Sequence, residues 1–270
     1  MIGSIKLEKL TEENKSLAVE LKKCKEELNK INRRLQYNYR QKDEFISMAA
    51  HELRAPMTAI KGYVSMLLSG DAGPLSEKAI GYLLDTSAIS DRIIRLVNNM
   101  LNVSRIEEGR TTYQMIKVNM LAIVKQVYEQ TKFEAKRKGL KYTLDTQRGL
   151  IDSVFVDPDR LYEVIDNLVS NAIKYTNTGS VIIKIANPSK GFVKLELQDS
   201  GPGISLSEQK RLFRKFYRVK STVGKTIGTG LGLYISKLLV ERFGGSMGVD
   251  SSTDKGATFW FKLPVDVEEK

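Results

Sequence analysis

The sequence predicts an α+β protein. A long N-terminal coiled coil and a helical hairpin form a dimeric four-helix bundle, and an α/β sandwich follows. Three observations predict this order. Apolar residues recur every three or four positions from residue 7 to about residue 67. Two glycines and a proline at 69–74 then interrupt the helical pattern, which resumes and ends near Gly109. Beyond about residue 112, short β-branched stretches alternate with helical segments.

Residues 1–44 are predicted to form one helix of a parallel, dimeric coiled coil. Its apolar seam steps by three and four residues through Leu7, Leu10, Leu17, Leu21, Cys24, Leu28, Ile31 and Leu35. Asn14 fills the seam position between Leu10 and Leu17, and a polar Asn at such a position commonly fixes register and a two-stranded state. No Gly or Pro follows Gly3 in this run, which favours a coiled coil over a single amphipathic helix lying on a globular body.

Residues 45–112 are predicted to form the hairpin, which serves as a dimerisation domain. The first helix runs through Pro56 to about residue 67, and Ser76 with Glu77 opens the second. Gly109 marks its end, where a left-handed residue is expected. One hairpin leaves an apolar face exposed, and pairing two hairpins in a four-helix bundle buries it. We therefore expect a homodimer.

Residues 113–270 are predicted to form the sandwich. The expected strands are 141–146, 154–156, 181–186, 193–198 and 258–263, and the expected helices lie near 119–138, 159–175, 205–216 and 231–243. Strands mixed with helices, with several strands at hairpin-like spacing, are typical of an α+β layer architecture.

Composition excludes several classes of protein. A hydrophobic fraction of 41% against 28% charged residues argues against disorder, and the N-terminus is too charged for a signal peptide. No apolar run reaches the roughly 18 residues of a membrane span. One cysteine, Cys24, excludes internal disulfides and fits a reducing compartment. One histidine, His51, excludes most zinc sites and limits a serine triad to that imidazole. We expect a cytoplasmic chain, free or tethered to a membrane through a sensor region outside it.

His51 stands in a helical segment with an unusual surrounding sequence. At about 100° per residue, Ala49, Leu53 and Pro56 share one face, and His51 lies at about 200° from it on the exposed face. The neighbouring Glu52 carboxylate can accept the second ring proton and make the other nitrogen more nucleophilic. Pro56 cannot donate to the Glu52 carbonyl, so a bend is expected just beyond His51. A solvated surface histidine is the alternative, but the acid and the bend favour a nucleophile presented to a partner.

A polar helical face provides the first candidate nucleotide site. Asn167, Asn171, Lys174 and Tyr175 lie together by the i, i+3, i+4 rule. A carboxamide oxygen can ligate Mg²⁺, an ammonium suits a phosphate and a phenol ring suits a base. An ordinary polar surface is the alternative for this motif by itself.

The stretch Asp199-Ser-Gly201-Pro-Gly203-Ile204 directly follows a predicted strand. An Asp at a strand end can accept a hydrogen bond from an exocyclic amine, and the glycines let a ring approach the backbone. A tight turn would have the same pattern, so this motif alone does not decide between the two.

A second glycine-rich stretch, with Gly228, Gly230 and Gly232, opens an apolar helix whose N-terminal amides suit a phosphate. It is not a dinucleotide fingerprint, because Ile235 stands where the third glycine would be. Seven Lys and Arg residues and no acid occupy 210–225, so much of the net charge of +11 precedes this loop. Nucleic-acid binding is the rival interpretation, but no recognition motif or aromatic platform accompanies the basic segment. We therefore expect a bound phosphate and no nucleic-acid partner.

Together these motifs resemble the sensor histidine kinases of two-component systems, over residues from about 40 to 264. Each is weak alone, but five in order at family-like spacing are specific. They are His51-Glu-Leu-Arg (H box), Asn167 to Tyr175 (N box), Asp199 to Ile204 (G1 box), Leu212 to Arg218 (F box) and Gly228 to Leu233 (G2 box).

The resemblance implies a catalytic ATP-binding domain of the gyrase and chaperone ATPase type. His51 would be the phosphoacceptor and Glu52 its general base. Asn171 would hold Mg²⁺, with Asn167 beside it. The implied nucleotide contacts are Lys174 to phosphate, Tyr175 and Thr258 near adenine, Asp199 to the adenine amino group with Gly201 and Gly203 beside it, Arg218 to the γ-phosphate, and Gly228, Gly230 and Gly232 around the triphosphate.

The implied activity is an ATP-dependent protein-histidine kinase that autophosphorylates His51 and passes the phosphoryl group to an aspartate of a response regulator receiver domain. Ala55 departs from the family, whose kinase–phosphatases usually carry Thr or Asn there. A methyl group cannot hold a hydrolytic water, so we expect weak phosphatase activity. Two alternatives remain: an ATPase that uses hydrolysis for conformational work, and a catalytically silent dimeric scaffold.

Overall fold

The computed structural model describes residues 2–189, 191–219 and 228–266. Contacts between Cα atoms divide the chain into two units, residues 1–53 and residues 54–270. In the first unit the backbone is helical and belongs to α1 (Ile2–Leu68). Side chains at Leu7, Leu10, Asn14 and His51 lie outside the described residues. Described seam residues such as Leu17 and Leu28 are exposed in the single chain, so the coiled coil and the domain boundaries at 44/45 and 112/113 stay predictions.

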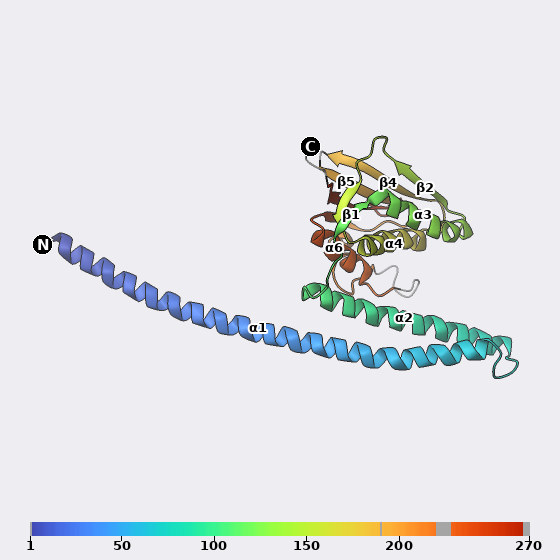
Figure 1. Ribbon diagram of the computed structural model, residues 1–270, viewed down its shortest axis with the longest axis horizontal. Helices are drawn as coiled ribbons and strands as arrows, with labels where there is room; N and C mark the ends of the chain where they lie inside the picture. The colour runs from blue at the N-terminus through green and yellow to red at the C-terminus, as the bar shows by residue number, and fades with distance from the viewer. Residues whose placement is uncertain (1, 190, 220–227, 267–270) are drawn as a thin grey trace. The chain divides into compact units, whose positions relative to one another are not determined.

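The second unit begins with the end of α1 and with α2 (Glu77–Glu107), the predicted helical hairpin (Figure 1). As expected, Ser76 caps α2, accepting a hydrogen bond from the Ala79 amide at 3.3 Å. Gly109 has a φ of +66°, the left-handed conformation expected beyond a helix end. Lys61 on α1 pairs with Asp91 on α2, with 2.7 Å between Nζ and Oδ1. That ion pair lowers the pKa of Asp91.

Beyond the hairpin, the second unit contains two sheets. A five-stranded sheet has the strand order β2-β4-β5-β7-β6, in which β2 is parallel to β4 and the other neighbours are antiparallel. Its strands are β2 (Lys141–Thr146), β4 (Ser180–Ser189), β5 (Phe192–Asp199), β6 (Ser246–Ser251) and β7 (Ala257–Pro264). A separate antiparallel pair joins β1 (Ile116–Asn119) to β3 (Ser153–Val156).

Helices α3 (Met120–Arg137), α4 (Pro158–Tyr175) and α6 (Gly232–Arg242) cover one face of the five-stranded sheet (Figure 1). Alternate residues of β4, namely Val181, Ile183 and Ile185, are buried against them, as the period of two requires. Asp157 caps α4 by accepting hydrogen bonds from two amides of its first turn. This packing fixes α4, the helix that carries four of the predicted site residues.

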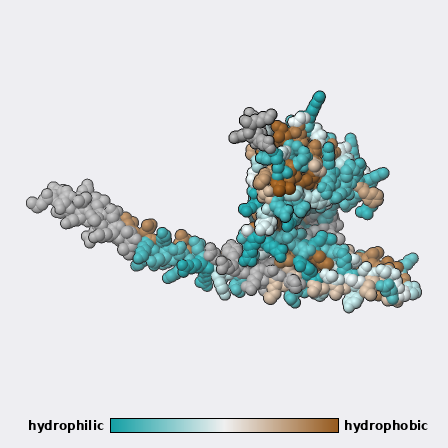
Figure 2. Space-filling model, viewed as in Figure 1, coloured by the Kyte–Doolittle hydropathy of each residue, from teal (hydrophilic) through white to brown (hydrophobic). Residues whose placement is uncertain are grey.

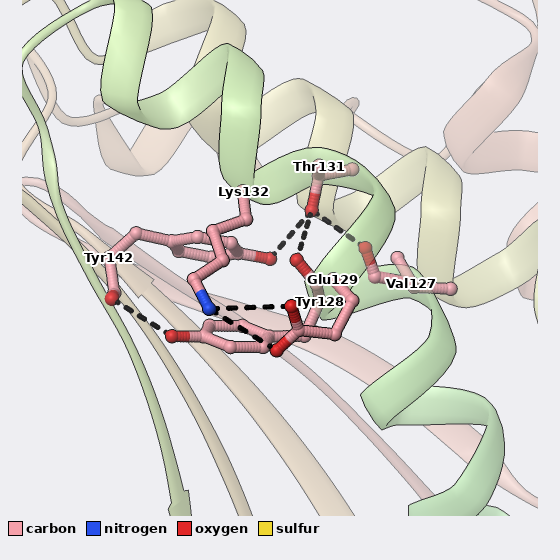
Figure 3. A network of polar contacts seen from close by, with 6 residues as sticks. All are labelled: Val127, Tyr128, Glu129, Thr131, Lys132 and Tyr142. Carbon is pink, nitrogen blue, oxygen red and sulfur yellow. Dashed lines mark hydrogen bonds and ion pairs between the residues drawn. The ribbon is translucent and has the colours of Figure 1, made fainter.

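A polar network ties α3 to β2 within this core (Figure 3). The Thr131 hydroxyl lies 2.8 Å from the Val127 carbonyl and 2.8 Å from the Tyr142 hydroxyl, while the Tyr128 hydroxyl donates to the Tyr142 carbonyl at 3.3 Å. The rings of Tyr128 and Tyr142 stack with centroids 4.6 Å apart, and Lys132 lies over the Tyr128 ring. Burial raises the pKa of Tyr142. The network satisfies polar atoms that would otherwise be buried without partners.

Two local predictions were wrong. The expected helix over 205–216 is limited to α5 (Leu206–Gln209), after which the chain turns and Phe216 has a φ of +60°. Strands β1 and β6 were not expected. β1 has only four residues, and β6 contains Gly248, whose missing side chain makes room for the Trp260 ring. A Cβ there would lie 2.4 Å from that ring, so packing selects the glycine against its low strand propensity.

Figure 2 shows a cluster of brown, hydrophobic atoms on the part of the surface that carries the sheets. Exposed apolar residues in this part of the chain include Ile116 of β1, Ile151 just before β3, and Phe155 of β3, which is 54% exposed. Within the described ranges, no helix combines the length and apolarity needed to cross a membrane.

Candidate functional site

The second unit contains a cavity of about 340 Å³, within the size range of small-molecule sites. Its wall is built from α4, the loops after β5 and before α6, the segment around residues 212–219, the start of β7, and α2. Ten predicted residues line it: Asn167, Asn171, Lys174, Tyr175, Asp199, Gly203, Arg218, Gly228, Gly230 and Gly232. Motifs separated by more than sixty residues in the sequence therefore form one site.

On α4, the two asparagines are linked by hydrogen bonds. Asn171 Nδ2 donates to Asn167 Oδ1 at 3.3 Å, and Asn167 Nδ2 donates to Ser236 Oγ on α6 at 2.9 Å. These bonds use the nitrogen of each carboxamide, which leaves Asn171 Oδ1 for a ligand in the cavity. Asn167 acts mainly as the bridge that holds Asn171 against α6.

Asp199 stands at one end of the cavity, 8% exposed. Its Oδ1 accepts hydrogen bonds from the amides of Gly201 at 2.8 Å and Ala257 at 3.3 Å, which leaves Oδ2 for a ligand. Burial raises the pKa of the Asp199 carboxyl, and the two amides oppose that shift. Gly203 has a φ of +69°, and a Cβ there would lie 2.0 Å from the Ser252 carbonyl, so only glycine fits the turn.

Cationic groups gather at the glycine loop, the segment 228–232 before and at the start of α6. A Cβ on Gly228 would lie 3.3 Å from Lys174 Nζ, and 3.9 Å from both Arg218 Nε and the Tyr175 hydroxyl. Gly230 has a φ of +73° and packs against the backbone of Phe216, which excludes a side chain. Because glycine leaves the loop amides uncovered at the start of α6, this end of the cavity suits phosphate.

Helix α2 provides a wall that the sequence did not predict. Arg92, Arg95 and Asn99 line the cavity, and Asn99 Nδ2 donates to the Thr229 hydroxyl in the glycine loop at 3.3 Å. Near the end of α2, Glu107 pairs with Lys215 at 2.6 Å and accepts a hydrogen bond from Tyr234. Nothing in the local sequence of a hairpin helix indicates which of its residues a later domain will contact.

Four predicted residues stand apart from this lining. Gly201 supports Asp199 through its amide and does not line the cavity. Thr258 is also absent from the lining, whereas its neighbours on β7, Ala257 and Phe259, are part of it, as strand alternation requires. Glu52 is exposed on α1 in the first unit, and the side chain of His51 lies outside the described residues.

The donor set fits Mg²⁺ better than a protein-only metal cage. Across the described part of the chain, no group of three or more His, Cys, Asp or Glu side chains could hold a metal ion. Mg²⁺ commonly takes one or two protein oxygens and completes its shell with phosphates and water. Asn171 Oδ1 in a cavity with a phosphate-binding end satisfies that requirement.

Comparison with known families matches two domain models in order. Residues 41–109 match the His Kinase A (phospho-acceptor) domain. Residues 156–267 match the histidine kinase-, DNA gyrase B- and HSP90-like ATPase domain. The two matches cover the predicted hairpin and most of the predicted sandwich.

Curated relatives and solved structures agree with these matches. The signal transduction histidine-protein kinase BarA of Escherichia coli is 30% identical over 246 residues, 89% of this chain and 26% of BarA. The circadian input-output histidine kinase CikA of Synechococcus elongatus is 32% identical over 226 residues, 83% of this chain and 30% of CikA. The chain thus spans less than a third of the length of these relatives.

Two solved structures share the fold. Full-length ShkA in complex with AMPPNP superposes with a TM-score of 0.69 at 27% identity, over 82% of this chain and 45% of ShkA. Histidine kinase ThkA in complex with the response regulator protein TrrA superposes with a TM-score of 0.59 at 22% identity, over 84% of this chain and 63% of that one.

Proposed function

The chain belongs to the sensor histidine kinases, with a phospho-acceptor domain ahead of an ATP-binding domain, and from this premise we propose that it transfers the γ-phosphoryl group of ATP to His51. The phosphoryl group then passes to an aspartate of a response regulator receiver domain. One observation carries the proposal: the lining of a single cavity combines the buried carboxylate of Asp199 with a glycine loop that has Lys174 and Arg218 beside it.

The cavity orients the nucleotide by its two ends. Asp199 Oδ2 accepts a hydrogen bond from the adenine amino group, because Oδ1 is already held by two amides. Apolar groups beside it, including Ile204, Leu212 and Phe259, suit the faces of the base. Lys174 and Arg218 then face the phosphates, with the glycine loop amides around the triphosphate.

Asn171 Oδ1 holds Mg²⁺ in this proposal, and Asn167 fixes the orientation of the Asn171 carboxamide. The ion supplies charge neutralisation of the β- and γ-phosphates. The residues provide positioning and fixed positive charge, which are the main protein contributions to phosphoryl transfer.

At the acceptor, a neutral imidazole nitrogen of His51 bonds to the γ-phosphorus as the bond from that phosphorus to the bridging oxygen breaks, and ADP leaves. Glu52, the next residue on α1, takes the proton from the other ring nitrogen. In the second step the phosphorus–nitrogen bond breaks and the receiver carboxylate takes the phosphoryl group. Two copies of the chain pair through their hairpins in this proposal, as the matched phospho-acceptor domain favours. The proposal also assigns the chain to the cytoplasm.

Labelling with ³²P-ATP tests the proposal. Wild type should acquire a label that is stable in alkali and lost in acid, and His51→Gln should acquire none. Since His51 is the only histidine in the sequence, no other residue can produce a phosphohistidine. An acid-stable label, or a label that survives in His51→Gln, would overturn the assignment.

From Ala55 we infer that the phosphatase activity of this kinase is weak. It is exposed on α1 four residues beyond His51, one helical turn further along. Its methyl group offers no hydrogen bond to orient a water toward the phosphorylated aspartate of a regulator. The phosphorylated partner should therefore persist in the presence of the wild-type chain.

A further inference from the structure

Two arginines on the hairpin helix α2 face the nucleotide cavity from outside the ATPase domain. Arg92 and Arg95 lie one turn apart and both line the cavity, together with Asn99 one turn further on. We propose that Arg92 and Arg95 bind the polyphosphate tail of the nucleotide, which makes the hairpin part of the nucleotide site. This inference rests on the proposed ATP-dependent function and adds binding residues to it.

Packing and polar contacts hold α2 beside the cavity. Val103 is buried in the core of the ATPase domain, and Met100 and Ile106 pack against that core. Beyond them, Glu107 pairs with Lys215 at 2.6 Å. At the cavity itself, Asn99 donates to Thr229 of the glycine loop at 3.3 Å. Arg92 and Arg95 lie on the same helix, so these contacts hold their backbone beside the cavity on the side of Thr229.

The charges around the cavity are strongly one-sided. Four basic side chains line it, namely Arg92, Arg95, Lys174 and Arg218, and Asp199 at the adenine end is the one carboxylate among the described lining residues. Positive charge gathered in one cavity attracts an anion of high charge. A triphosphate supplies several negative charges, whereas AMP carries only its α-phosphate.

The two guanidinium groups are available for such an anion. Among the residues that the structure describes, neither forms a side-chain hydrogen bond or an ion pair, and both residues are exposed and line the cavity. The neighbouring acid on the helix, Asp91, is paired with Lys61 at 2.7 Å, and Arg95 only adds a weaker electrostatic attraction to the same carboxylate. A planar guanidinium can bond two phosphate oxygens at once, which suits a terminal phosphate better than an ammonium does.

The position of the arginines predicts a dependence on phosphate number. In the proposed binding mode adenine and the α-phosphate contact the ATPase domain alone, so AMP should bind without help from α2. Additional phosphates extend toward the glycine loop and Thr229, whose partner Asn99 lies on α2. The contribution of Arg92 and Arg95 should therefore increase from AMP through ADP to ATP.

Calorimetric titration of the full 270-residue chain with Mg²⁺ and ATP, ADP or AMP tests this. The double variant Arg92→Ala/Arg95→Ala should bind ATP about tenfold more weakly, in line with the loss of charge-assisted hydrogen bonds at an exposed site. The tenfold loss for ATP corresponds to about 1.4 kcal/mol of binding free energy. ADP binding should weaken less, and the Kd for AMP should stay within about twofold of the wild-type value. Arg105→Ala is the matched control, because Arg105 is an exposed arginine of the same helix outside the cavity lining.

Each result has a definite meaning. Equal ATP affinity in wild type and the double variant would overturn the inference while leaving the proposed function in place. An equal loss for ATP and AMP would also overturn it, because the arginines would then act on folding or on α2 rather than on the phosphate tail. Wild type that binds no adenine nucleotide would overturn the proposed function itself. Circular dichroism of the variant, together with its AMP affinity, checks that it folds.

Discussion

Replacing Gly232 by alanine should lower both the stability of the chain and its affinity for ATP. Gly232 is the first residue of α6, and a Cβ there would lie 2.3 Å from Asn167 Oδ1 and 3.0 Å from its Cγ. A shift of the Asn167 side chain would break hydrogen bonds, because it donates to Ser236 at 2.9 Å and accepts from Asn171 at 3.3 Å. The methyl group therefore displaces the residue that orients the predicted Mg²⁺ ligand.

The expected magnitudes follow from opposing terms. Overpacking costs about 1–3 kcal/mol, and each lost hydrogen bond costs about 1 kcal/mol. Alanine regains up to about 1 kcal/mol of helix propensity. The free energy of unfolding should fall by about 1–3 kcal/mol. ATP affinity should fall about tenfold or more, since a loss of 1.4 kcal/mol at the Asn171 ligand already amounts to tenfold.

Denaturant unfolding and calorimetric ATP titration measure the two effects. Gly81→Ala in α2 is the control, because nothing lies within 4 Å of a Cβ at that position. It should raise the free energy of unfolding by about 0.5–1 kcal/mol and leave ATP affinity unchanged. Asn167→Ala combined with Gly232→Ala should recover stability but not ATP affinity. A Gly232→Ala protein with wild-type stability and affinity would refute the contact with Asn167.

Three further changes test other parts of the account. Burial raises the pKa of Asp199, so folding takes up a proton there, and this group contributes less stability as the pH rises through that pKa. Asp199→Asn should therefore keep or raise Tm at neutral pH, yet weaken ATP binding in calorimetry, because its amide would face the adenine amino group. Lys138 Nζ donates to three carbonyls at the end of α4, at 2.7, 3.0 and 3.4 Å. Lys138→Ala should lower the free energy of unfolding by about 1 kcal/mol and weaken ATP binding, whereas exposed Lys136→Ala should change neither. Ala55→Thr should speed dephosphorylation of a phosphorylated receiver domain; efficient hydrolysis by wild type would contradict the role given to Ala55.

The parts of the fold with strong local signals were predictable from the sequence. Ser76 and Gly109 bound α2 as expected, because caps and left-handed glycines act within a few residues. The segment around Leu212 was predicted as a helix, and this prediction was wrong. Its apolar residues resemble a helix face, but Leu212 is buried in the cavity wall and the chain turns at Phe216.

The site was predictable where a motif carries its own chemistry and was missed where distant segments meet. Asp199 was predictable because it stands at the end of a strand, and the glycines of 228–232 were predictable because they stand at the start of a helix. Thr258 was placed one residue from the lining position Ala257, because the sequence does not tell which face of β7 meets the cavity. Arg92 and Arg95 were missed because they come to the cavity only where α2 packs beside the loop before α6.

Parallel measurement of ADP and of labelled protein shows whether the chain is a histidine kinase. With excess ³²P-ATP and no partner, a histidine kinase should produce ADP in a burst that matches the labelled chain, with at most one acid-labile phosphate per chain, because His51 is the only histidine. ADP formation should then nearly stop, and His51→Gln should show neither burst nor label. Continuous phosphate release without phosphohistidine would contradict the account and identify an ATPase that uses hydrolysis for conformational work.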